Sequence, residues 1–195
     1  MEMEQVKELL IQSLEVEKGG VKLYEAAVSV AQNEDLKEEW EKYLAQTRTH
    51  VTTLERVITA LGMDPKEHTS GSSIQSELGA ALLQAIETAK EGDPAAAELV
   101  AAEIIVLAET KDHLDWELIG EVAQKLKGDE KKALLEAYEE VEDQEDEHLY
   151  HTKGWCRELW LKSLGLKAML PPPEERKHVK TAIGAARAEA SRKHH

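Results

Sequence analysis

Glu145 and His148 are the clearest pair of side chains in this sequence that could hold a metal ion. They lie three residues apart on a predicted helix, so both side chains leave one face and can reach one ion. Carboxylate oxygen and imidazole nitrogen are ligands that suit iron, manganese or zinc. The pair also falls on an apolar stripe that passes through Tyr138, Val141 and Trp155. Because an uncompensated charge in a core is costly, this placement favours a bound cation.

Two other predicted helices show the same interruption of an apolar stripe. Glu17 interrupts the stripe of the first helix, and Thr47 and His50 interrupt that of the second. The turn between these helices lies near residues 33–34. Glu17 and His50 lie about 16 residues on either side of it, which places them at one height for a rise of about 1.5 Å per residue. An acid and an imidazole are therefore expected to meet at one level of the bundle.

The helix at about 95–126 offers Glu109 at the matching height, with Asp112 close behind. One register turns inward Ala102, Ile105, Glu109, Asp112, Trp116 and Ile119. The other turns inward Ile104, Leu107, Leu114 and Leu118. We prefer the first register because it alone supplies a metal ligand at this height, and the choice between Glu109 and Asp112 stays open.

The elements that must position these residues are helices throughout, so the fold class is all-α. Long helices are expected at about 6–31, 36–61, 95–126 and 130–164, with a shorter one at about 74–90. Asp93-Pro94 reads as a helix start, and Gly128-Asp129 as a tight turn. The prediction is a four-helix bundle of two antiparallel hairpins joined by a crossover that holds the short helix. It occupies residues 1–168, and a Pro-rich linker with a short helical tail follows at 169–195.

Composition narrows the classes of function. The net charge of −15 over 195 residues argues against a nucleic-acid partner. Cys156 is the single cysteine, so no internal disulfide can form and a reducing compartment is expected. The N-terminus lacks the pattern of a signal peptide, and no apolar run approaches membrane-spanning length. We therefore expect a cytoplasmic protein with no membrane partner.

At these residues the sequence resembles the ferritin-like di-metal carboxylate superfamily, which includes ferritins, bacterioferritins and rubrerythrins. Glu17 is followed seven residues later by Tyr24, Glu145-x-x-His148 stands on the last long helix, and Glu109 matches the single acid of the third. The resemblance covers roughly residues 5–155. It implies a ferritin-like bundle that binds iron, with manganese or zinc as alternatives. It also implies oxidase or peroxide-scavenging chemistry, with dioxygen or peroxide as the co-reactant.

The second helix departs from that family pattern. The family carries Glu-x-x-His there, whereas this chain has Thr47-x-x-His50. Three ligand carboxylates then remain, unless Asp112 becomes the fourth. The metal ligands expected on this basis are Glu17, His50, Glu109, Asp112, Glu145 and His148, with Tyr24 and Thr47 beside them.

Two other functions are compatible with the same residues. The bundle could be a non-enzymatic helical dimer or partner-binding module whose inner polar groups pair with one another. It could also be a metal sensor without turnover. The sequence leaves open whether the chain is a metal-dependent oxidoreductase, and we expect a homo-oligomer, most simply a dimer.

Overall fold

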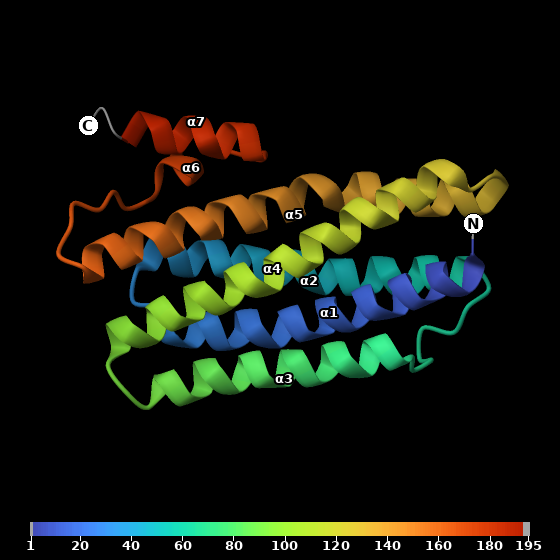
Figure 1. Cartoon of the computed structure of the whole chain (residues 1–195), viewed down its shortest axis with the longest axis horizontal. Coiled ribbons are helices and arrows are strands. Elements are labelled where there is room, and N and C mark those ends of the chain that lie inside the picture. Colours follow the sequence, from blue (N-terminus) through green and yellow to red (C-terminus); the bar gives the residue numbers. More distant parts are fainter. Residues whose placement is uncertain (1, 193–195) are drawn as a thin grey trace.

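The computed structural model describes residues 2–192, and within that range it contains seven helices and no strand. This confirms the all-α class (Figure 1). In chain order the helices are α1 (Met3–Val30), α2 (Glu34–Ala60), α3 (Ser70–Lys90), α4 (Pro94–Lys125), α5 (Gly128–Ser163), α6 (Pro173–Arg176) and α7 (Ala182–Arg192). None of the described helices combines the length and the apolar character needed to cross a membrane.

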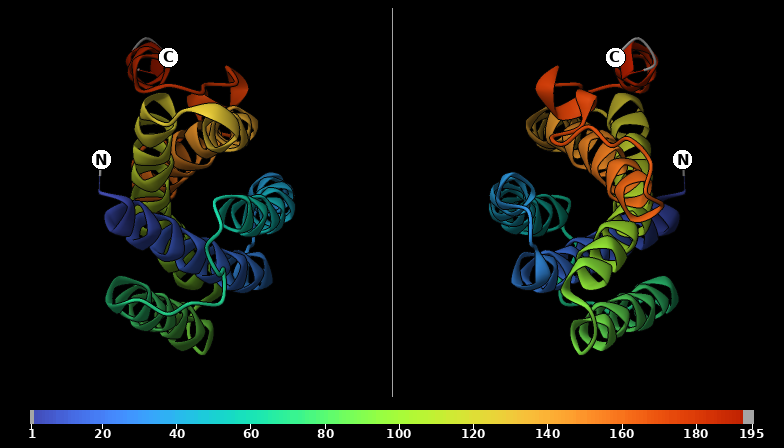
Figure 2. Two further views of the ribbon diagram at one scale, coloured as in Figure 1. Left: turned by 90° about the vertical axis from the view of Figure 1, so that its right-hand side faces the viewer. Right: turned by 90° about the vertical axis from the view of Figure 1, so that its left-hand side faces the viewer.

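Four long helices form the bundle as two antiparallel hairpins, as predicted. Helix α1 packs on α2 and α4 on α5, while α1–α4 and α2–α5 contacts join the hairpins (Figures 1 and 2). The first turn is short because the Asn33 side chain caps α2, accepting hydrogen bonds from the backbone N–H groups of Asp35 and Leu36. At the second turn Gly128 adopts a φ of 62°, a left-handed conformation that glycine permits without strain.

Helix α3 is the predicted crossover helix, and it packs outside the bundle on α1 and α4. It begins with a capping box between Thr69 and Ser72. The Glu8 carboxylate of α1 accepts hydrogen bonds from the Thr69 hydroxyl (3.0 Å) and the Gly71 backbone N–H (2.9 Å). Helix α4 then starts with Asp93 as its N-cap and Pro94 in its first turn, as the sequence predicted.

The C-terminal extension contains two helices, α6 and α7, where the sequence predicted one. Both pack on α5, on the opposite side of the bundle from α3 (Figure 2). Arg157 on α5 donates to both carboxylate oxygens of Glu174 at 2.6 and 2.9 Å. Gly154 allows this approach, because a Cβ at that position would lie 2.7 Å from a Glu174 oxygen. Residues 193–195 of the predicted tail lie outside the described part of the chain.

The apolar core is divided into two clusters, one toward each end of the bundle. The first contains Trp40, Tyr43 and Trp155, and the second contains Leu54 and Trp116. Each long helix contributes to both clusters and passes through a polar stretch between them.

The packing of α4 follows the preferred register. Ala102, Ile105, Glu109, Asp112, Trp116 and Ile119 are all buried. In the rejected register Leu107, Leu114 and Leu118 are between 43 % and 59 % exposed, although Ile104 is buried. The inward face of α4 therefore carries Glu109 and Asp112 together.

Candidate metal centre

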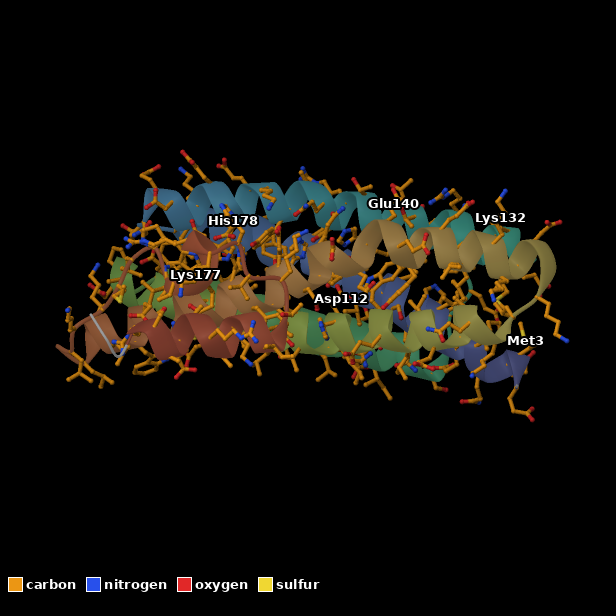
Figure 3. The ribbon with its side chains drawn as sticks, turned by 90° about the horizontal axis from the view of Figure 1, so that it is seen from above. Met3, Asp112, Lys132, Glu140, Lys177 and His178 are labelled. Carbon is orange, nitrogen blue, oxygen red and sulfur yellow. The ribbon has the colours of Figure 1, made fainter. Side chains whose placement is uncertain are left out.

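A layer of polar side chains separates the two apolar clusters near the middle of the bundle, where Figure 3 labels Asp112. All eight residues predicted for the site are buried in it, each at most 4 % exposed. They are Glu17, Tyr24, Thr47, His50, Glu109, Asp112, Glu145 and His148. The structure therefore brings together the predicted site residues of four helices.

Within this layer two groups of three have the geometry of metal ligands. One is Glu17, His50 and Glu145, and the other is Glu109, Glu145 and His148. In each group the ligand atoms lie within 4.8 Å of one another. Glu145 belongs to both groups, so its carboxylate stands between two potential cation positions.

The imidazole nitrogens face these carboxylates directly. His50 Nδ1 lies 2.9 Å from Glu145 and 3.4 Å from Glu17. His148 Nδ1 lies 3.4 Å from Glu145 and 3.6 Å from Glu109. Each nitrogen is thus in position either to pair as imidazolium with the acids or to share a cation with them.

Two glutamines orient the histidines from behind. Nε2 of His50 lies 3.1 Å from the Gln144 side-chain oxygen, and Nε2 of His148 lies 3.0 Å from that of Gln46. A hydrogen bond from Nε2–H to an amide oxygen leaves the Nδ1 lone pair free to point inward. Sequence reasoning missed both glutamines, because each reaches its partner from a neighbouring helix.

The carboxylates are held in the same way. The Tyr24 hydroxyl donates to Glu109 at 2.7 Å, which places this tyrosine beside a candidate ligand. The Trp116 indole N–H donates to Glu17 at 2.8 Å. The sequence placed Trp116 on the inward face of its helix but gave no sign of this hydrogen bond. Tyr24 occupies Oε1 of Glu109 and leaves Oε2 facing His148, whereas Trp116 donates to the same Glu17 oxygen, Oε1, that faces His50.

Several buried atoms of the centre make no hydrogen bond of good geometry, although the histidine nitrogens lie 2.9–3.6 Å from the carboxylates and buried polar atoms are normally satisfied. They are Glu17 Oε2, His50 Nδ1, Glu109 Oε2, Asp112 Oδ1, both oxygens of Glu145, and His148 Nδ1. Every one is a carboxylate oxygen or an imidazole nitrogen. This donor set fits a divalent cation of the borderline or hard type.

Burial and mutual charge displace the pKa values of these groups. Burial raises the pKa of Glu17 to about 7, against the lowering effect of His50. Burial also opposes ionisation of Glu145, but His148 and His50 together hold its pKa at about 2. Burial acts to lower the pKa of His148, yet Glu145 and Glu109 raise it to about 9. Without a cation, the centre is therefore neutralised by protons held on its own residues.

The family pattern left two questions: whether Asp112 acts as the fourth acid, and what Thr47 contacts in place of the usual Glu. Asp112 belongs to neither group of three, but burial and then the charges of Glu17, Glu145 and Glu109 raise its pKa well above the usual range. It therefore lies within electrostatic reach of the other acids. Thr47 instead donates its hydroxyl to the Tyr43 backbone carbonyl at 2.9 Å, one turn back on its own helix.

A second polar cluster lies behind His148. The Tyr43 ring packs on the His148 imidazole with centroids 4.2 Å apart. Its hydroxyl donates to Glu39 and lies 3.0 Å from His151 Nδ1, which in turn is 2.7 Å from Glu39. Nδ1 of His151 is therefore turned toward Glu39 and Tyr43, and His151 belongs to neither group of candidate ligands.

Comparison with known proteins gives a family and no individual relative. No curated protein and no solved structure matches the chain. The family described as "Domain of unknown function (DUF892)" matches residues 4–153, which span the four candidate ligand helices as far as Lys153 on α5. The match covers most of the chain and includes every candidate ligand, so the chain belongs to this family.

Proposed function

We propose that this chain is a ferritin-like metal-binding protein whose centre holds two divalent cations bridged by Glu145. Glu17 and His50 would complete one position, and Glu109 and His148 the other. The observation that carries the proposal is the pair of buried groups of carboxylate oxygens and imidazole nitrogens that share Glu145, with the ligand atoms of each group within 4.8 Å of one another.

Charge balance supports the assignment of two cations. Glu17, Glu109, Glu145 and Asp112 carry four negative charges when all are ionised, which matches two divalent ions. In this proposal Asp112 supplies the fourth charge that Thr47 cannot. Cation binding then displaces the protons that neutralise the metal-free centre, so uptake releases protons to the solvent.

Iron is the metal we propose, with manganese or zinc as alternatives for the same oxygen and nitrogen donors. Bound iron would supply redox chemistry toward dioxygen or peroxide. The residues of the chain would orient the ligands through Gln46, Gln144, Tyr24 and Trp116, and the two apolar clusters would exclude bulk water. Assembly as a dimer and a cytoplasmic location stay predictions.

The test is metal content after purification without a chelating column, removal of bound metal and anaerobic reconstitution with Fe²⁺. We expect about two equivalents per chain, whereas less than about 0.2 would refute the proposal. Glu145→Gln should lose both equivalents because it removes the shared ligand. Glu139→Gln, an exposed position on the same helix, makes the same change of charge and should bind normally.

Dioxygen and peroxide consumption by the reconstituted protein separates the remaining functions. Consumption that Glu145→Gln abolishes supports an oxidoreductase. Stoichiometric binding without consumption supports the sensor. Unaltered consumption in Glu145→Gln would contradict this assignment of the centre.

A further inference from the structure

A groove of about 560 Å³ lies between α4 and α5 and leads from the surface to the candidate centre. Its lining includes Trp116 and Glu145, each only 1 % exposed, so its floor is the edge of the buried polar layer. Thr181 and Ala182, where α7 begins, border it from outside, and Figure 2 shows α7 lying against the outer side of the α4–α5 hairpin.

The groove is important because Glu145 forms part of its floor. Glu145 is the residue shared by both groups of candidate ligands, and its buried carboxylate lies 2.9 Å from His50 Nδ1 and 3.4 Å from His148 Nδ1. We propose that the groove is the entry route for a hydrated divalent cation, which reaches Glu145 before the other candidate ligands and is passed from it to either position. The inference rests on the proposed function, because it needs a cation site at the end of the route.

The charge of the groove selects for cations. Glu117, Glu121, Glu142 and Asp146 line it above Glu145, whereas His113 is the single basic residue in the lining. A cleft lined by one sign of charge raises the local concentration of the opposite ion and its rate of association. A second groove, between α1, α3 and α4, is lined mainly by apolar side chains and contains none of the candidate ligands.

On this route Asp146 would bind the cation before it reaches Glu145. It follows Glu145 directly in α5, and its carboxylate lies 2.6 Å from Nε2 of His113 on α4. A cation that replaces the imidazole at Asp146 is then beside the bridging ligand. Lys180 pairs with Asp143 of α5 at 3.1 Å, which holds the following residues at the mouth of the groove.

The experiment measures the rate at which metal-stripped protein takes up Co²⁺, followed by stopped-flow visible absorbance. The variant Glu117→Gln/Glu121→Gln/Glu142→Gln removes three exposed acids of the groove and none of the candidate ligands. We expect its association rate to fall about threefold to tenfold at low ionic strength, with unchanged final stoichiometry. The wild-type rate should also fall more steeply with added salt than that of the variant.

The matched control makes the same change of charge on α3, which does not contact α5 in the bundle. Glu77→Gln/Glu87→Gln/Glu91→Gln alters two exposed acids of α3 and the exposed acid at its C-cap, and should take up Co²⁺ at nearly the wild-type rate. A second pair of variants each places a positive charge at a different position on α7. Ala182→Arg at the mouth should slow uptake, whereas Ala190→Arg near the other end of α7 should not.

Equal slowing by the groove and α3 variants would overturn the entry route, as would no slowing by either. Loss of stoichiometry in the groove variant alone would also overturn it, since these acids would then be ligands. A wild-type chain that binds no Co²⁺ at equilibrium refutes the proposed function itself and leaves the route without a destination. Normal stoichiometry with unchanged rates refutes the route alone.

Discussion

Raising the pH should destabilise the metal-free protein, because His148 holds a proton in the folded state that the unfolded chain releases. Its pKa rises from 6.5 to about 9 on folding, through pairing with Glu145 and Glu109 against the effect of burial. The stabilisation is complete below pH 6.5 and disappears as the pH rises through 9. A displacement of this size corresponds to about 3 kcal/mol of unfolding free energy.

Other groups titrate in the same direction and must be separated from His148. The pKa of Glu17 rises from 4.5 to about 7, so its contribution falls mainly below pH 7. Burial, and then Glu39, raise the pKa of Glu175 to about 8, and this group is only half-buried. A His148→Gln variant retains both acids, so the difference between it and the wild type reports His148 together with the Glu145 carboxylate that it pairs with.

The assay is urea unfolding of chelator-treated protein, followed by far-ultraviolet circular dichroism between pH 6.5 and 9. The wild type should lose about 3 kcal/mol more than His148→Gln across this range. A saturating divalent cation should stabilise the wild type increasingly as the pH rises, because binding requires unprotonated His148. Parallel pH profiles for the two metal-free proteins would refute the assignment of a buried His148–Glu145 ion pair.

Two further predictions concern groups around the centre. Tyr24→Phe removes the hydroxyl that donates to Glu109 at 2.7 Å, and should weaken cation binding about 10-fold to 100-fold in a Co²⁺ titration; unchanged affinity would exclude this orienting role. Gly120→Ala places a Cβ 2.6 Å from the Tyr138 ring, whereas a Cβ at Gly19 meets nothing within 4 Å. In urea unfolding, the Gly120→Ala variant should therefore be less stable than the Gly19→Ala variant by about 1–3 kcal/mol. Equal stabilities would show that Tyr138 moves aside without cost.

The polar residues that interrupt the apolar stripes could be predicted from the sequence, because the periodicity of a helix depends only on the residues of that helix. Glu17, His50, Glu145 and His148 each fall at a core-facing position, and two short turns set their heights along the antiparallel hairpins. Once a helix is predicted, its rise and repeat determine these placements without knowledge of the partner helix. The family resemblance then suggested what chemistry the residues share.

Tertiary structure decided what periodicity could not. Helix α4 is apolar on more than one face, so only packing determined that Glu109 and Asp112 point inward while Leu107 and Leu114 face outward. The roles of Gln46 and Gln144 depended on contacts between α2 and α5, about 100 residues apart in the chain.

The groove to Glu145 likewise exists only because α4, α5 and the start of α7 meet along one edge. Its acids come from separate helices, and their spacing within each helix carries no sign of that meeting. The sequence by itself therefore determined the helices and most of the inward-facing polar residues. The orientation of those residues and the route to them depend on side-chain contacts between helices, which only the folded chain creates.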